Sequence, residues 1–89
     1  MDDLKEISEL ILKLKNQEEI MAFLSELFTK KELLALSKRW RILKLLAKSS
    51  TQREIAAALN VSLCNVTRGA KVIKDKKSII TKYLRKDLK

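Results

Sequence analysis

Residues 51–74 read TQREIAAALNVSLCNVTRGAKVIK, and this stretch decides the fold. Thr51, with Glu54 three positions later, forms a capping-box pattern that predicts the start of a short helix. Asn60 interrupts the apolar spacing, and Ser62 is a favoured N-cap, so a second helix is expected to follow. Two short helices joined by a tight turn form a helix-turn-helix, a unit that places its second helix in the major groove of DNA.

The second helix of this unit is predicted to have an apolar inner face and a polar outer face. Apolar residues at helical spacing predict the buried side, which comprises Leu63, Val66, Ala70 and Ile73. The residues between them are predicted to be exposed: Cys64, Asn65, Thr67, Arg68 and Lys71. This face suits a helix that lies against the phosphates and base edges of DNA.

The rest of the chain also predicts helices. It has no proline and one glycine, and Lys, Glu, Leu, Ile and Ala dominate its composition. We therefore expect an all-α fold, a six-helix chain that forms a single domain over residues 1–89. Apolar spacing and capping residues predict four helices besides the two of the helix-turn-helix, at about 3–15, 17–27, 30–48 and 78–87. Residues 1–48 are assigned to dimerisation, 51–74 to the helix-turn-helix and 78–87 to the C-terminal helix.

The apolar content is too high for so short a chain to bury alone. Hydrophobic residues make up 46% of the 89 residues, whereas a domain of this size buries a limited core. The helix at 30–48 has one apolar face and further apolar residues beside it, which predicts cover on more than one side. These residues are Leu33, Leu36, Trp40, Leu43 and Ala47, extended by Ile42, Leu45 and Leu46. A homodimer is therefore expected.

Charge is distributed unevenly along the chain. Residues 1–27 hold three basic and seven acidic side chains, whereas residues 28–89 hold 17 basic and four acidic ones. A strongly basic body indicates a polyanionic partner, and its overlap with the helix-turn-helix favours double-stranded DNA. The alternative is a lysine-rich surface that is merely solvated.

Composition argues against several other functions. The chain has one cysteine and no histidine, so a zinc site, an internal disulfide and the usual nucleophile–base pairs lack their parts. We expect no catalytic residue, no metal and no enzyme activity. No apolar run is long enough for a membrane span, and the acidic N-terminus lacks a signal-peptide pattern, so we expect a cytoplasmic protein with no membrane partner.

Gly69, the only glycine, falls inside the predicted second helix of the motif. A glycine there costs about 1 kcal/mol relative to alanine, so it usually marks close packing or the close approach of a ligand. Arg68 beside it and Arg39 on the long helix would suit a flat ligand with a carboxylate, which arginine binds in a fork geometry. Arginines on a DNA-binding helix also contact phosphate, so both interpretations stay open.

Taken together, these residues resemble the Trp repressor family along roughly residues 28–84. FTKKELLALSKRWRILKLL is similar to the long central helix of that family, and TQREIAAALNVS followed by VTRG is similar to its DNA-reading motif. The resemblance implies six helices per chain in an intertwined homodimer. It further implies a transcriptional repressor that binds operator DNA, with L-tryptophan as corepressor and no other cofactor.

The resemblance also implies a ligand pocket. Arg39 and Arg68 match the residues that flank the indole ring, Arg68 also matches the residue that holds the carboxylate, and Gly69 matches the glycine beside the ring. Further pocket positions, the first of them contributed by the partner subunit, are Thr29, Leu43, Asn65 and Val72. Asn65 and Val72 replace a threonine and a serine of the family. Without the serine hydroxyl, a buried ammonium group loses a partner at a cost of about 1–3 kcal/mol, so a related small aromatic acid is an alternative effector.

On the DNA side, Gln52 and Arg53 match the start of the first motif helix, where the arginine reads a guanine. The base-facing edge of the recognition helix matches Leu63, Cys64 and Thr67, and we expect Lys71 and Lys74 to contact phosphates. Two alternatives to a ligand-activated repressor remain. One is a ligand-independent helix-turn-helix repressor, and the other is a helical protein-interaction module.

Overall fold

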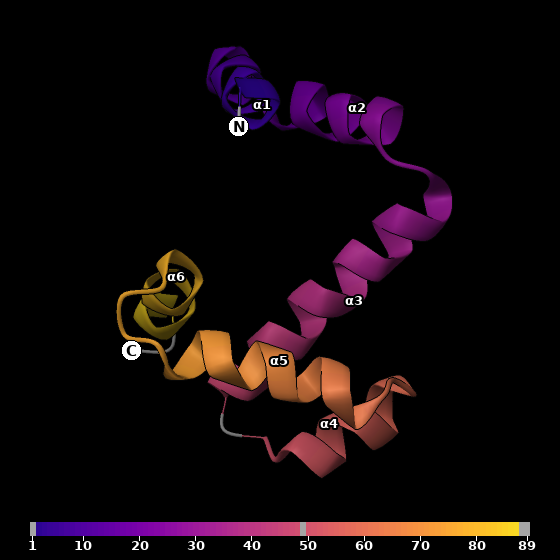
Figure 1. Cartoon of the computed structure of the whole chain (residues 1–89), viewed down its shortest axis with the longest axis vertical. Helices are drawn as coiled ribbons and strands as arrows, with labels where there is room; N and C mark the ends of the chain where they lie inside the picture. The colour runs from indigo at the N-terminus through magenta and orange to yellow at the C-terminus, as the bar shows by residue number, and fades with distance from the viewer. Residues whose placement is uncertain (1, 49, 88–89) are drawn as a thin grey trace. The chain divides into compact units, whose positions relative to one another are not determined.

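The computed structural model describes residues 2–48 and 50–87, and these residues form six helices and no strand. The all-α, six-helix prediction is therefore confirmed. The helices are α1 (Asp2–Lys13), α2 (Gln17–Leu27), α3 (Lys30–Ala47), α4 (Gln52–Leu59), α5 (Leu63–Lys74) and α6 (Ile79–Asp87) (Figure 1). The chain divides into two compact units, Met1–Leu34 and Ala35–Lys89. The division falls within α3.

Polar side chains start five of the helices, because the first amides of a helix have no partner within it. At α3, the Thr29 N–H donates to Glu32 at 2.8 Å, and the Glu32 N–H donates to the Thr29 hydroxyl at 3.2 Å. The same reciprocal pair starts α4, between Thr51 and Glu54, at 3.0 and 3.1 Å. Single side-chain caps start α2, α5 and α6, from Asn16, Ser62 and Ser78.

The capping box of α4 has an electrostatic consequence. The hydrogen bond from the Thr51 backbone, with a smaller one from its side chain, lowers the pKa of the Glu54 carboxyl below its usual 4.5. A lowered pKa means that the charged form is favoured in the folded state. The hydrogen bonds from Thr51 to the Glu54 carboxylate therefore stabilise the folded state fully at a pH above the usual pKa. This stabilisation is lost as the pH falls through the lowered pKa.

Helix α1 ends at Lys13, two residues earlier than the predicted end at about residue 15. The next helix explains the difference. Its N-cap, Asn16, has an extended backbone with φ −155°, and the Lys15 N–H donates to the Glu19 carboxylate at 2.8 Å instead of to a helical carbonyl. The start of α2 thus competes with the last turn of α1.

The turn of the helix-turn-helix depends on Asn60. Among the described residues other than glycine, it alone has a positive φ, 52°. Asparagine tolerates this left-handed conformation better than most residues. The N–H groups of Asn60 and Val61 both return to the Ala56 carbonyl, which ends α4 and redirects the chain into α5.

Two hydrophobic clusters hold the C-terminal unit together, and both depend on the C-terminal half of α3. Ile42 of α3 packs with Ile55 of α4 and Val66 of α5 in the first cluster. Burying such a side chain contributes about 1.5–3 kcal/mol. In Figure 1, α4 lies beside one end of α5 and α6 beside the other. The second cluster joins α3 and α5 to α6 and contains Leu43, Ala47, Ile73 and Leu84.

Polar and aromatic contacts also join α6 to the other helices of this unit. The hydroxyl of Thr81, which is buried, donates to the Val72 carbonyl of α5 at 2.7 Å. The rings of Trp40 on α3 and Tyr83 on α6 lie 6.3 Å apart between centroids, with 46° between their planes. This geometry is typical of a favourable aromatic pair.

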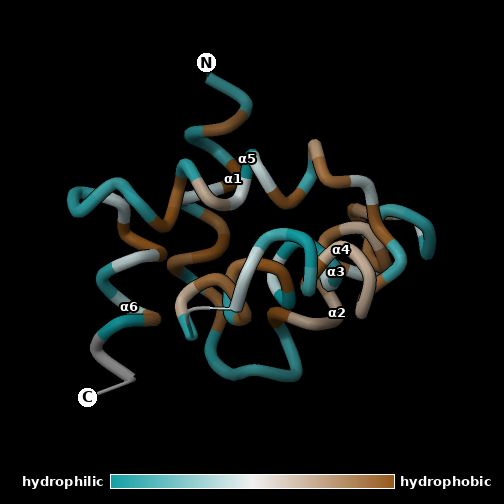
Figure 2. Tube along the Cα trace, turned by 90° about the horizontal axis from the view of Figure 1, so that it is seen from below, coloured by the Kyte–Doolittle hydropathy of each residue, from teal (hydrophilic) through white to brown (hydrophobic). Residues whose placement is uncertain are grey.

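The N-terminal unit leaves much of its apolar surface uncovered. Neither α1 nor α2 contains a buried residue. Figure 2 shows hydrophobic positions alternating with hydrophilic ones along α1. The exposed large apolar residues of the two helices are Leu4, Leu10, Ile11, Leu12, Ile20, Met21 and Leu27. A stripe of this kind normally packs against another surface.

The predicted burial of Leu63 is wrong, because 47% of this residue is exposed. Val66, Ala70 and Ile73 are buried as predicted. Leu63 is the first residue of α5, so it has no preceding helical turn, and the cluster formed by Ile42 and Ile55 begins at Val66. The side chain lies on the outer surface of α5 instead.

Removing the cap of α4 is expected to destabilise the helix-turn-helix. Thr51→Ala should lower the free energy of unfolding by about 0.5–2 kcal/mol, because the Glu54 N–H loses its acceptor. Thr51→Ser keeps the hydroxyl and is the matched control. Urea unfolding followed by circular dichroism measures both. Equal stabilities of the two variants would contradict the importance of this cap.

Candidate nucleic-acid interface and ligand pocket

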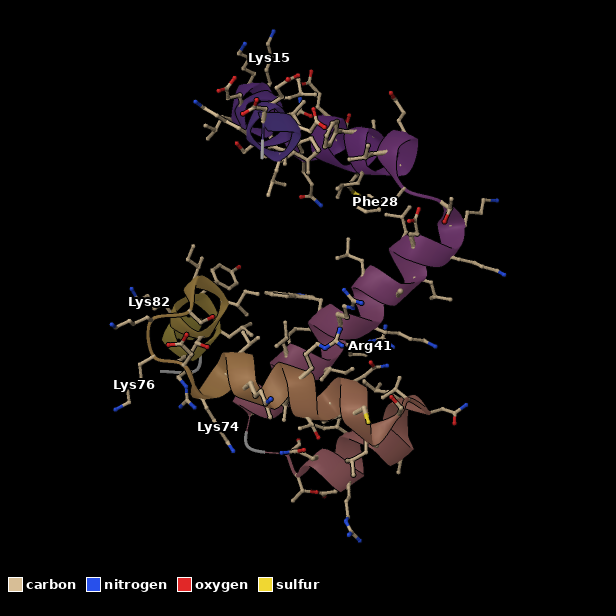
Figure 3. The ribbon with its side chains drawn as sticks, in the orientation of Figure 1. Lys15, Phe28, Arg41, Lys74, Lys76 and Lys82 are labelled. Atoms are coloured by element: carbon tan, nitrogen blue, oxygen red, sulfur yellow. The ribbon has the colours of Figure 1, made fainter. Side chains whose placement is uncertain are left out.

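The predicted DNA-contacting residues lie on α4 and α5, and we call them the outer face. Six of the seven are exposed, and Gln52 is partly buried at the start of α4. Lys71 and Lys74 lie in the last turn of α5, where a positive charge is favourable for the helix dipole. Figure 3 shows the Lys74 side chain extending away from the ribbon. The outer face comprises Gln52, Arg53, Leu63, Cys64, Thr67, Lys71 and Lys74.

A side-chain hydrogen bond connects the two helices of the outer face. The Thr67 hydroxyl on α5 lies 2.9 Å from Gln52 Oε1 on α4 and also 2.9 Å from the Leu63 carbonyl oxygen. The hydroxyl has one proton, so it donates to one of these acceptors at a time. This contact links two predicted DNA-contacting residues that lie 15 positions apart in the sequence.

The outer face of α5 is hollowed. A shallow depression of about 350 Å³ is lined by apolar, polar and basic side chains. Leu63 supplies an apolar surface of the kind that contacts thymine methyl groups, while the basic residues suit phosphates. The lining residues are Leu63, Cys64, Thr67, Arg68 and Lys71.

The predicted ligand-binding residues gather around a second cavity, between α3 and α5, which we call the ring pocket. Its volume is about 110 Å³. Six of the seven predicted residues line it, namely Arg39, Leu43, Asn65, Arg68, Gly69 and Val72, and Ile42 completes the lining. The structure thus brings together residues that are up to 33 positions apart in the sequence.

The ring pocket has an apolar floor and a polar rim. Ile42 and Leu43 are buried and Val72 is partly buried, whereas the side chains of Arg39 and Arg68 are exposed. An apolar cavity of about 150 Å³ holds one benzene ring. A pocket of about 110 Å³ therefore suits one small ring whose polar substituent points toward the arginines.

Close helix packing accounts for Gly69. A Cβ atom at this position would lie 3.1 Å from Leu46 Cδ1 and 3.2 Å from Ile42 Cγ2 on α3. Distances this short would force the neighbouring side chains to move by a few tenths of an ångström. The absence of a side chain thus lets α5 approach α3, and the same gap forms part of the ring pocket.

Thr29, the seventh predicted ligand residue, lies in the N-terminal unit, where it caps α3. Its hydroxyl accepts the Glu32 N–H, which is a structural role within its own chain. The predicted contribution of Thr29 to a pocket of the partner subunit concerns a second chain and stays a prediction.

Sequence reasoning missed three residues beside these sites. Ile42 was assigned only to the apolar arc of the long helix, yet it also lines the ring pocket. Lys76 and Lys82 are exposed, and Figure 3 shows them with Lys74 around the end of α5 and the start of α6. Their only signal in the sequence was the general excess of basic residues after residue 28.

Arg68 lines two of the cavities described above. It lines the ring pocket on one side of α5 and the depression of the outer face on the other. The ring pocket and the depression that Thr67 and Lys71 line therefore share one basic residue.

Of three comparisons with known proteins, one found a match. The sequence model of the Trp repressor protein family matches residues 2–88. No curated protein and no solved structure matches the chain. None of the helices in residues 2–48 and 50–87 combines the length and the apolar character needed to cross a membrane.

Proposed function

Because the chain belongs to the Trp repressor family, we propose that it is a dimeric, sequence-specific transcriptional repressor whose DNA affinity depends on a small aromatic acid. The family is one of DNA-binding transcriptional regulators and not of enzymes. In this proposal, α5 enters the major groove of a palindromic operator, and the effector occupies the ring pocket.

The position of Arg68 carries this proposal. The residue lines both the ring pocket and the depression of the outer face. In this proposal, its guanidinium binds the acid of the effector or a DNA phosphate. An effector that fills the gap between α3 and α5 restricts the tilt of α5 and the orientation of this side chain. Ligand occupancy and DNA affinity are then coupled, and by reciprocity DNA raises the affinity for the effector.

The dimer in this proposal is supported by the uncovered apolar side chains of α1 and α2. Leu12 is 85% exposed and Leu4 is 61% exposed, although both lie on a helix with regular apolar spacing. We infer that a second chain covers these residues, in an intertwined arrangement of the first three helices. Two copies also present two recognition helices, as a palindromic operator requires.

An obligate dimer should melt at a temperature that depends on protein concentration, because unfolding is then coupled to dissociation. We expect the melting midpoint to rise when the concentration is raised from the low to the high micromolar range. Scanning calorimetry measures the midpoint, and analytical ultracentrifugation measures the mass. A folded 10.3 kDa species at micromolar concentration would rule out an obligate dimer.

Substitutions on the outer face should distinguish a residue that reads a base from a residue that contacts phosphate. Arg53→Ala should cost about 1–3 kcal/mol on a selected operator and relax the sequence preference, if the guanidinium reads a guanine. Lys71→Ala should weaken binding to all duplexes and reduce the dependence on salt. Fluorescence anisotropy on operator and random duplexes, at several salt concentrations, gives both quantities.

Two results would overturn parts of this assignment. If Arg53→Ala and Lys71→Ala have the same effect on operator and random DNA, Arg53 does not read a base. If the wild-type protein shows no salt-sensitive affinity for any duplex, the chain is better explained as a protein-interaction module.

The proposal also concerns the chemical class of the effector, and Val72 is the residue that determines this class. The residue lines the ring pocket with an isopropyl group and offers no hydrogen-bond acceptor from its side chain. An α-ammonium group beside it would lose hydration without gaining a partner from this side chain. We therefore propose an aromatic acid, with L-tryptophan as the weaker candidate.

Restoring a hydroxyl should shift the preference toward the amino acid. We expect Val72→Ser to improve L-tryptophan binding about tenfold relative to indole-3-propionate, which corresponds to about 1.4 kcal/mol. Isothermal titration calorimetry measures both ligands on both proteins, with and without DNA. If neither ligand releases heat or changes DNA affinity for either protein, a ligand-independent repressor becomes the better explanation.

A further inference from the structure

A third hollow adjoins the ring pocket, and we call it the Lys38 hollow. Its volume is about 360 Å³, and it lies between α3 and the turn that joins α4 to α5. Three residues, Arg39, Ile42 and Asn65, line both cavities. The remaining residues that line it are Ala35, Lys38, Asn60, Val61 and Ser62.

The two cavities together are larger and more basic than an aromatic amino acid requires. The ring pocket alone, at about 110 Å³, suits little more than one small ring. The combined lining has three cations, Lys38, Arg39 and Arg68, and none of its residues is acidic. A ligand with one carboxylate and one ammonium group would leave this excess positive charge uncompensated.

The geometry points to an effector with an aromatic ring and a dianionic arm, which carries two carboxylates or one phosphate. The ring occupies the apolar floor formed by Ile42, Leu43 and Val72. The arm passes between Arg39 and Asn65, and its outer negative charge is held by the Lys38 ammonium in the Lys38 hollow. This inference rests on the proposed effector pocket and names the ligand class that the pocket selects.

The chemistry of the lining favours this ligand class on three counts. Arginine binds carboxylate or phosphate through two parallel hydrogen bonds, and lysine adds a mobile point charge. The Asn65 amide and the Ser62 hydroxyl are polar groups that can solvate the middle of the arm. The Val72 side chain has no hydrogen-bond acceptor. This position therefore gives an amino acid no advantage over an acid that lacks the ammonium group.

A matched pair of ligands tests the second negative charge. Indole-3-acetyl-aspartate and indole-3-acetyl-alanine differ by one carboxylate. We expect the wild-type protein to bind the aspartate conjugate about tenfold more tightly by isothermal titration calorimetry. Lys38→Gln should reduce this ratio to about one. Lys44→Gln changes an exposed cation of the same helix that lines neither cavity, and it should leave the ratio unchanged.

A phosphate as the source of the dianion is tested in the same way, with 3-indoxyl phosphate compared with indole-3-acetate. Loss of the preference for the phosphate in Lys38→Gln, and not in Lys44→Gln, would support a phosphate-bearing effector. If Lys38→Gln leaves the preference unchanged in both ligand pairs, the inference is overturned. It is also overturned if Lys38→Gln weakens DNA binding without any acid more than Lys44→Gln does, since the Lys38 hollow would then hold a DNA phosphate.

Failure of this inference can be distinguished from failure of the proposed function. If indole-3-propionate binds and raises DNA affinity while neither dianion is preferred, the ring pocket stands and the Lys38 hollow carries no role in selection. If no acid binds at all, the effector-dependent function and this inference both fail. DNA binding measured in the same samples shows whether the repressor itself survives.

Discussion

The approach of α5 to α3 at Gly69 is the constraint on which the C-terminal unit depends. With Leu46 Cδ1 and Ile42 Cγ2 little more than 3 Å from where a Cβ would lie, a side chain here would require these neighbours to move by a few tenths of an ångström. The glycine costs about 1 kcal/mol in a helix interior. That cost is offset by the clusters around Ile42 and Leu43, which form because the helices lie this close. The gap beside the missing side chain forms part of the ring pocket, so the close packing of α5 on α3 also shapes this cavity.

The two units bury their apolar residues to different extents. In the C-terminal unit, α3 supplies one wall and α4, α5 and α6 cover it, so that Ile55 and Val66 are almost completely buried within a single chain. In the N-terminal unit, two amphipathic helices have no such wall, and Leu12 stays exposed. The C-terminal unit thus buries its core within a single chain, while the exposed apolar residues of the N-terminal helices support the proposed dimer.

Much of the fold was predictable because local signals coincide with it. Thr51 with Glu54 and Asn60 with Ser62 fixed the limits of α4 and α5, since caps and left-handed residues act over a few positions. The burial of Leu63 was wrongly predicted. Apolar spacing shows which side of a helix is apolar, but it does not show how far along the helix the neighbouring helices cover that side. Gly69, Arg68 and Arg39 were proposed from their own chemistry, whereas Leu43, Asn65 and Val72 came from the family resemblance, which spacing alone would not have supplied. Ile42 was missed because its role as a core residue conceals its contact with the cavity.

The shared lining of the cavities limits how an effector can act in the proposed function. A ligand shifts a conformational equilibrium only by the difference between its affinities for the two states. A ring on the apolar floor touches Ile42 and Leu43 of α3, which are fixed by the core, and also Val72 of α5. An acid at Arg68 touches a side chain on α5 itself, whose other side belongs to the outer face. In the proposed function, the effector therefore contacts α5 at both ends, with its ring at Val72 and its charged end at Arg68, and both contacts contribute to the discrimination between positions of this helix.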